Sequence, residues 1–248
     1  YCSGAGYTTS GTKGTSTITY GNLGNKGVLT SGDAFDCDVN GDGVFDSETE
    51  RFYYVSDYYN TSTKAFEDDT AVLIYYNNVS TGSPSNNTTY AYDSSGENFH
   101  GPRTAFAQLP TTSQWSNMSL KNTTRAILNE NESNTTKGGV LPSNYSYEGY
   151  AARLLTLQEI RQATEINNMP TFKVGELDNF TYLMENTKFS SDSNSAWTWW
   201  LENARSDNSI CAWYVNGYHR LVTNDIVSYA GLVGVRPVIE VSKKNIDY

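Results

Sequence analysis

The sequence has few basic residues and few histidines, and it lacks a long apolar run. Lys and Arg number 17 against 27 Asp and Glu, which gives a formal net charge of −10. Because nucleic-acid phosphates attract Lys and Arg, this balance disfavours nucleic acid as a partner. No apolar run is long enough to span a bilayer, and no signal peptide stands at Tyr1. We therefore expect a trimmed piece of a longer protein, with a fibre or membrane anchor in a missing N-terminal segment.

Catalytic motifs are also missing. The two histidines, His100 and His219, stand in unrelated contexts, and the chain has no Gly-x-Ser-x-Gly elbow, phosphate loop or His-Glu-x-x-His. The sequence therefore predicts that the protein is not an enzyme. A glycan-active enzyme stays the less favoured alternative, because the carboxylate pair of a glycoside hydrolase is defined by separation in space rather than by a motif.

The chain is instead rich in Tyr (19 residues), Asn, Ser, Thr and Gly, which is typical of a protein with short strands and a polar, well-hydrated surface. A helix is predicted over 156–167, because Thr156 and Glu159 have the spacing of a capping box and Pro170 follows. A second helix is expected over 119–130, and a polar loop over 57–70. Together these signals predict an α+β fold with short antiparallel sheets, two helices and long loops. Strands are expected over 16–20, 51–56, 71–76, 196–201, 211–215 and 235–241.

Three cysteines leave at least one thiol unpaired within the chain. Cys2 and Cys37 both lie in Gly-rich, loop-like surroundings, so we favour a disulfide between them. Cys211 begins an apolar strand, and we expect it to be a small buried residue. The spacing of the three gives no zinc signature.

A calcium-like loop follows Cys37. Asp and Asn alternate at positions one, three, five and nine of this loop, and a Gly at position six permits a sharp turn. The loop resembles those of EF-hand and dockerin modules, but its position twelve is Thr49, so a neighbouring acid must substitute. Structural calcium is the expectation, and an acidic Asn-Gly/Asp-Gly turn without an ion is the alternative. The expected ligands are Asp38, Asn40, Asp42, Val44, Asp46 and Glu50.

Two C-terminal motifs carry a family resemblance. Arg153, Leu154, Thr156 and Glu159 resemble the Arg-Leu-Pro-Thr-x-x-Glu segment of the formylglycine-generating-enzyme-like family, with Leu155 where Pro is usual. The 234–238 sequence Gly-Val-Arg-Pro-Val resembles the closing strand of that family, which carries a C-type-lectin-like fold. The resemblance implies a ligand-binding portion over 148–248 and a strand- and loop-rich portion over 1–147, within one continuous domain.

A departure from the family pattern argues against assigning the formylglycine-generating activity to this chain. Formylglycine-generating enzymes use a pair of C-terminal cysteines, whereas this chain has only Cys211 in that region. The Trp-Trp-Leu sequence at 199–201 and the segment 212–217 are similar to bacterial surface domains that also end in Gly-Val-Arg-Pro. The first part of the chain resembles prepilin-like surface proteins.

Some members of this superfamily are variable proteins of diversity-generating retroelements, in which a stretch before the closing strand is diversified. The equivalent stretch here is 197–232, which is rich in the Tyr, Asn and Ser that make adaptable binding surfaces. Strand alternation predicts that Tyr214, Asn216 and Tyr218 face outward while Trp213 and Val215 pack inward. The expected ligand-binding residues are Trp200, Glu202, Asn203, Tyr214, Asn216, Tyr218, His219, Arg220, Asn224, Asp225 and Tyr229.

The sequence thus predicts an extracellular or cell-surface protein of bacterial type that binds a protein or glycan ligand on another cell or surface. A structural subunit of a pilus or surface layer is the alternative.

Overall fold

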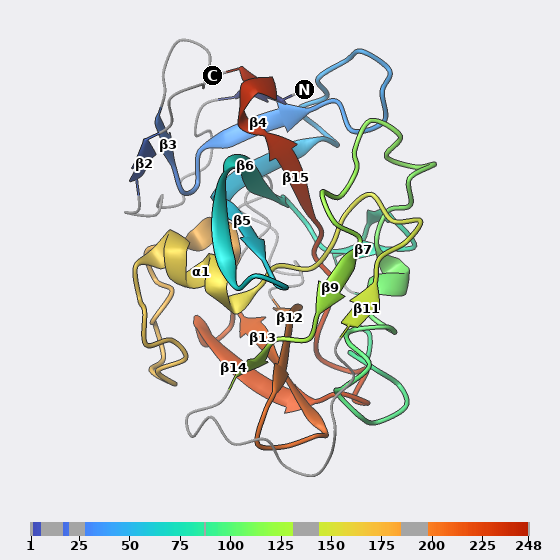
Figure 1. The fold of residues 1–248 in the computed structure, drawn as a ribbon, viewed down its shortest axis with the longest axis vertical. Coiled ribbons are helices and arrows are strands. Elements are labelled where there is room, and N and C mark those ends of the chain that lie inside the picture. Colours follow the sequence, from blue (N-terminus) through green and yellow to red (C-terminus); the bar gives the residue numbers. More distant parts are fainter. Residues whose placement is uncertain are drawn as a thin grey trace.

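The computed structural model describes residues 2–5, 17–19, 28–86, 88–130, 144–184 and 198–247. Two β-sheets dominate these residues, and Figure 1 shows them one above the other with a single α-helix beside the upper one. The expected α+β class with two helices is therefore wrong, because the described part of the chain is mostly β and holds one α-helix.

The first sheet has six strands and combines both ends of the sequence. All of its neighbouring strands are antiparallel except the first and last strands of the chain, which run parallel to each other. Strands from the predicted 1–147 and 148–248 portions thus pair directly. The order is β15 (Val238–Ser242), β6 (Ala65–Tyr75), β5 (Arg51–Asn60), β4 (Ala34–Cys37), β1 (Cys2–Gly4) and β16 (Ile246–Asp247).

The second sheet has four strands in the order β10 (Asn129–Glu130), β12 (Thr198–Arg205), β13 (Cys211–Asn216) and β14 (Leu221–Ile226). Its last three strands are antiparallel neighbours. Three small sheets pair β2 (Thr17–Thr19) with β3 (Val28–Thr30), β7 (Val79–Ser80) with β8 (Ser83–Pro84), and β9 (Thr124–Ala126) with β11 (Asn144–Ser146). Short 3-10 turns are η1 (Phe106–Gln108), η2 (Thr181–Leu183) and η3 (Lys243–Asn245).

The helix α1 (Leu157–Thr164) confirms the predicted capping box. The Thr156 hydroxyl accepts a hydrogen bond from the Glu159 amide at 3.1 Å, and the Glu159 carboxylate accepts one from the Thr156 amide at 3.0 Å. The helix ends before Pro170, at Glu165, whose φ of 60° is left-handed. Its apolar face packs against β5, within the sheet that contains β15.

Two sequence predictions about the first half are wrong. The 119–130 segment is not a helix: Arg125 lies in β9, and its buried guanidinium pairs with Glu202, 77 residues away, at 3.0 Å. The 57–70 segment is not a polar loop, because β5 runs to Asn60 and β6 begins at Ala65. Polar side chains mark the tip of a long hairpin there rather than a break in the strands.

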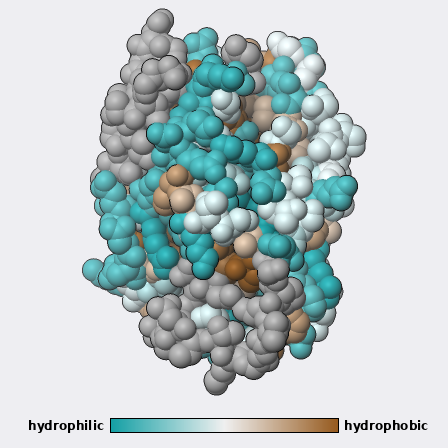
Figure 2. Space-filling model, viewed as in Figure 1, coloured by the Kyte–Doolittle hydropathy of each residue, from teal (hydrophilic) through white to brown (hydrophobic). Residues whose placement is uncertain are grey.

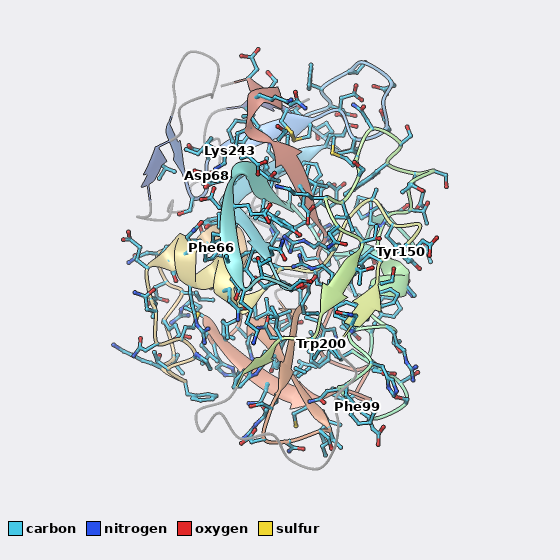
Figure 3. All side chains as sticks on the ribbon, viewed as in Figure 1. Phe66, Asp68, Phe99, Tyr150, Trp200 and Lys243 are labelled. Carbon is cyan, nitrogen blue, oxygen red and sulfur yellow. A yellow bond between two sulfur atoms is a disulfide. The ribbon has the colours of Figure 1, made fainter. Side chains whose placement is uncertain are left out.

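Buried ion pairs tie the helix to the first sheet. Arg153 is fully buried and donates to Glu159 at 2.7 Å and to Glu240 of β15 at 2.6 Å. Burial by itself would raise the pKa of Glu159, but the charge and hydrogen bonds of Arg153 hold that pKa below its ordinary value. Directly after β15, Lys243 of η3 points toward Asp68 of β6, whose carbonyl accepts its hydrogen bond (Figure 3).

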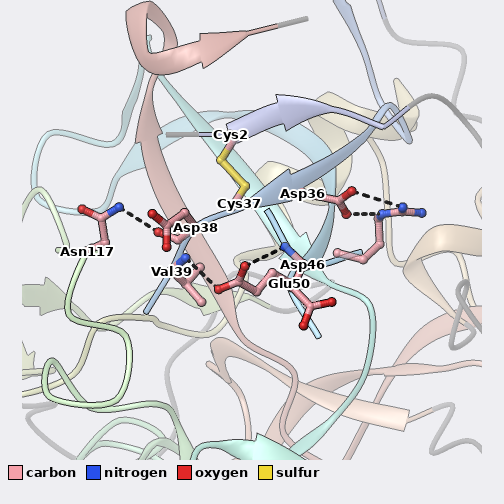
Figure 4. The surroundings of a disulfide bond; sticks show 9 residues. Cys2, Asp36, Cys37, Asp38, Val39, Asp46, Glu50 and Asn117 are labelled. Atoms are coloured by element: carbon pink, nitrogen blue, oxygen red, sulfur yellow. Dashed lines mark hydrogen bonds and ion pairs between the residues drawn. A yellow bond between two sulfur atoms is a disulfide. The ribbon is translucent and has the colours of Figure 1, made fainter. Parts of the chain in front are cut away.

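The predicted disulfide is confirmed. Cys2 and Cys37 are bonded, and they are directly opposite partners in the antiparallel pair of β1 and β4 (Figure 4). Cys211 is a buried free thiol, as expected. Within the described residues, no helix is long and apolar enough to cross a membrane.

Candidate functional site

Chain segments cover both faces of the four-stranded sheet, and this decides which predicted site residues are accessible. Neighbouring residues of β12 point to opposite faces, and each Trp indole there donates to a different segment. Trp199 donates to the Leu183 carbonyl at 2.9 Å, and Trp200 donates to the Tyr90 carbonyl at 2.8 Å. The 165–184 and 88–104 regions therefore lie on opposite sides of the sheet.

Five of the predicted ligand-binding residues are consequently buried, and the expectation that Tyr214 and Asn216 face outward is wrong. The alternation of side chains was correct, but it does not expose a face that another segment covers. Figure 3 places Trp200 well inside the molecule, where its ring meets Tyr214 edge to face at 5.7 Å between centroids. The buried residues are Trp200, Glu202, Asn203, Tyr214 and Asn216.

The buried polar members of this set have structural partners. Glu202 pairs with Arg125, and the Asn203 side-chain oxygen accepts from the Leu157 amide at 2.9 Å, at the first turn of α1. These contacts satisfy groups that could not be left unpaired in the interior. Glu202 and Asn203 thus hold the interior together and do not present a surface to a ligand.

The other six predicted residues separate into two groups along β14. Tyr218, His219 and Arg220 form the exposed turn that joins β13 to β14. Asn224 and Asp225 are half-buried near the far end of β14, and Tyr229 is exposed beyond it. A six-residue strand is about 20 Å long, so one small ligand cannot contact both groups.

The segment that follows α1 lies against the turn formed by Tyr218, His219 and Arg220. Main-chain hydrogen bonds join Gly175 to the His219 carbonyl at 3.0 Å and Leu177 to the Arg220 carbonyl at 2.9 Å. An ion pair between Arg220 and Asp178 fastens the two segments further. We call the exposed residues of this junction the turn surface: Phe172, Val174, Tyr218, His219 and Arg220.

Backbone strain marks the same junction. Phe172 has φ 58° and Arg220 has φ 55°, and residues with a Cβ rarely adopt this left-handed region. Such a conformation costs on the order of 1–3 kcal/mol and persists only where the surroundings enforce it. Glu176 supplies part of that enforcement, because its carboxylate accepts from Thr171 at 3.0 Å and from the β14 residue Val222 at 3.3 Å.

Buried residues also support the turn surface from below. The Asn216 side-chain oxygen accepts from the His219 amide at 3.1 Å, and its amide nitrogen lies 3.3 Å from His219 Nδ1. The Phe172 ring packs on the buried Trp213, with 5.9 Å between centroids. Asn216 therefore positions a surface that it was expected to form itself.

The predicted calcium loop is organised by hydrogen bonds from its own backbone amides. The Asp38 carboxylate accepts from Gly41 at 2.9 Å and from Gly43 at 3.0 Å. Glu50 closes the loop, since its two oxygens accept from Val39 at 3.2 Å and from Asp46 at 3.0 Å (Figure 4). Each of these hydrogen bonds from a backbone amide stabilises the charged carboxylate without the help of a cation.

A calcium ion would need six to eight oxygens directed at one point. Among the described residues, no group of three or more acidic, His or Cys side chains is placed to hold a metal. Of the expected ligands, Asn40 and Asp42 bond to each other at 3.1 Å, and Val44 is exposed. Burial raises the pKa of Glu50, although the loop amides oppose the shift. The loop's polar pattern is thus accounted for by its turns, and calcium stays a prediction.

Comparison with protein-family models, with curated proteins and with solved structures finds no match to this chain. The family resemblance therefore stays a prediction that rests on the motifs. Phe172, Val174 and Asp178 were not identified from the sequence, because they precede the 197–232 stretch in which binding residues were expected. The available signal was a pair of apolar residues spaced by two in a short Pro- and Gly-bounded loop, Pro170 to Gly175.

Proposed function

We propose that this protein is an extracellular binding protein that contacts its ligand, a protein or a glycan, through the turn surface. The observation that carries the proposal is the exposure of apolar side chains on a backbone that two segments lock in place. The exposed fractions are 41% for Phe172, 58% for Val174 and 56% for Tyr218.

Such a surface suits recognition for two reasons. Aromatic side chains offer a large contact area at a low cost in conformational entropy, and a rigid backbone lowers that cost further. Clustered exposed apolar groups are also unfavourable for an isolated protein, so they suggest a partner. On the face shown in Figure 2, the described residues are largely hydrophilic and the apolar ones form small separate spots.

An oxidising location and the position of the chain ends agree with this role. Disulfides such as Cys2–Cys37 persist mainly outside the cytosol, which supports an extracellular or cell-surface site. The parallel pair of β1 and β16 places the two ends of the described chain beside each other in the upper sheet, while β14 lies in the lower sheet (Figure 1). The two ends of the described chain therefore lie in a different sheet from the turn surface.

The test is a binding screen with matched variants. Labelled protein is applied to arrays of glycans and of cell-surface protein ectodomains, and each hit is re-measured with Tyr218→Ala, Phe172→Ala and the control Phe66→Ala. Phe66 is another exposed aromatic, 38% accessible, on the hairpin of the first sheet (Figure 3). We expect about a tenfold loss of affinity for the two turn-surface variants and none for the control. Hits that all three variants bind as the parent does would show that the turn surface is not the site.

A further inference from the structure

Strand β15 forms an edge of the six-stranded sheet and is only partly covered. It pairs with β6 along one side. On its other side Val238 exchanges two main-chain hydrogen bonds with Arg153, at 2.8 and 3.1 Å. In the described part of the chain, no further strand pairs with this side of β15.

The register identifies which main-chain groups the edge presents. Tyr75 of β6 donates to the Pro237 carbonyl at 2.9 Å, so position 237 faces β6. In an antiparallel pair the inward and outward positions alternate, which places Ile239 and Val241 inward and Glu240 and Ser242 outward. Glu240 directs one N–H and one C=O group outward, and Ser242 directs its N–H outward, while the Ser242 carbonyl begins η3.

A groove lies over the end of β15 and the neighbouring Asp69 and Thr70 of β6. Its volume is about 310 Å³, and it lies between β15 and the loop that begins at Asn117. Side-chain oxygens and amides dominate its walls, so it suits a polar main chain better than an apolar ligand. The lining residues are Asp69, Thr70, Asn117, Met118, Ser119, Lys121, Glu240, Val241, Ser242 and Asn245.

The charges around the groove favour a cation. Lys121 forms ion pairs with both Glu67 and Asp69, so two carboxylates share one ammonium group. The hydrogen bonds from Lys121 hold the pKa values of both carboxyl groups below their ordinary range, and both are therefore ionised at neutral pH. The Asp69 side chain is 68% exposed and can meet a second cation.

From this geometry we infer a second binding site: an extended peptide with basic side chains adds as a strand to β15. Its main chain pairs with the outward groups of Glu240 and with the Ser242 N–H, and a Lys or Arg side chain lies over Asp69. Main-chain pairing gives affinity to strand addition, and the neighbouring side chains give selectivity. The site is independent of the turn surface, so either can fail without the other.

The probe is a blocked hexapeptide of sequence Thr-Lys-Val-Lys-Val-Thr, titrated to millimolar concentration into the ¹⁵N-labelled protein. We expect amide shifts concentrated at 117–121 and 240–242. The same peptide with alternate amides N-methylated cannot complete the ladder and should bind at least about fivefold more weakly. A version with Glu in place of Lys should also lose affinity.

Ser242→Pro is the decisive protein variant. It removes the outward N–H, and the φ of −58° at Ser242 already suits proline, so the fold keeps its hydrogen bonds. We expect an unchanged melting temperature and a loss of about three- to tenfold in affinity, whereas the matched Ser242→Ala binds as the parent does. Asp69→Asn should erase the preference for Lys over Glu. Absence of shifts at millimolar peptide, shifts away from the groove, or full affinity in Ser242→Pro would each overturn the inference.

Discussion

Tyr214 and Tyr218 make a matched test of how the four-stranded sheet is covered. They stand four residues apart, but Tyr214 is 4% exposed and Tyr218 is 56% exposed. Truncating Tyr214 to Ala removes a ring that packs against Trp200 and leaves a cavity between the sheet and its cover. Loss of a buried aromatic ring costs about 3–5 kcal/mol, whereas a surface truncation changes stability by about 0.5 kcal/mol or less.

In a protein of this size each kcal/mol lowers the melting temperature by about 2–4 °C, so Tyr214→Ala should melt at least about 6 °C lower. Urea denaturation followed by Trp fluorescence gives the free energies of unfolding. Tyr214→Phe is the control: it keeps the ring and should cost only about 1 kcal/mol. The opposite ranking, with Tyr218→Ala the more destabilised variant, would mean that the covered and open faces of the sheet have been assigned the wrong way round.

Three further predictions follow from other parts of the molecule. Removing the disulfide in a Cys2→Ala/Cys37→Ala variant opens a 35-residue loop and should cost about 4 kcal/mol in urea denaturation; equal stability would contradict the chain-entropy argument. Calorimetric titration of chelator-treated protein should show millimolar or tighter calcium binding that Asp38→Ala abolishes; no heat in the parent protein would refute the calcium prediction. The folded-state pKa of Glu159 lies below its ordinary value of 4.5, so its ion pair with Arg153 stabilises the fold above that pH. That contribution should disappear as the pH falls through the folded-state pKa. Glu159→Gln should therefore reduce how steeply the free energy of unfolding falls at acidic pH. An unchanged fall would contradict this prediction.

Local chemistry explains what the sequence predicted well. The capping box at Thr156 and Glu159 depends on residues three apart, and it appears as expected. The strands over 51–56 and 71–76 are recognisable because their residues favour a half-buried pleated surface, although both strands extend further than their apolar stretches. The disulfide was predictable because only one pair of cysteines had suitable surroundings.

Long-range contacts explain the failures. The 119–130 segment was expected to be a helix, but its residues 124–126 pair as β9, where Arg125 is buried against Glu202. Alternation along β13 correctly separates Tyr214 from Trp213, yet nothing within β13 reveals that both faces will be covered. The covering residues Leu183 and Tyr90 lie 16 and 110 positions from the Trp residues that donate to them, and their placement depends on the whole fold.

At the turn surface, the proposed binding residues are distinct from several of the residues that hold the surface in place. The hydrogen bonds from Gly175 to His219 and from Leu177 to Arg220, which join its two segments, use main-chain atoms. The Arg220–Asp178 ion pair and the Glu176 carboxylate join the same segments through side chains. Support from below comes from the buried Asn216, which also binds a main-chain amide. Exchanging the side chain at Tyr218 therefore breaks none of these bonds. Position 218 can therefore carry different side chains at small cost in stability, whereas the buried residues of the 197–232 stretch, such as Trp200 and Tyr214, cannot be exchanged in this way.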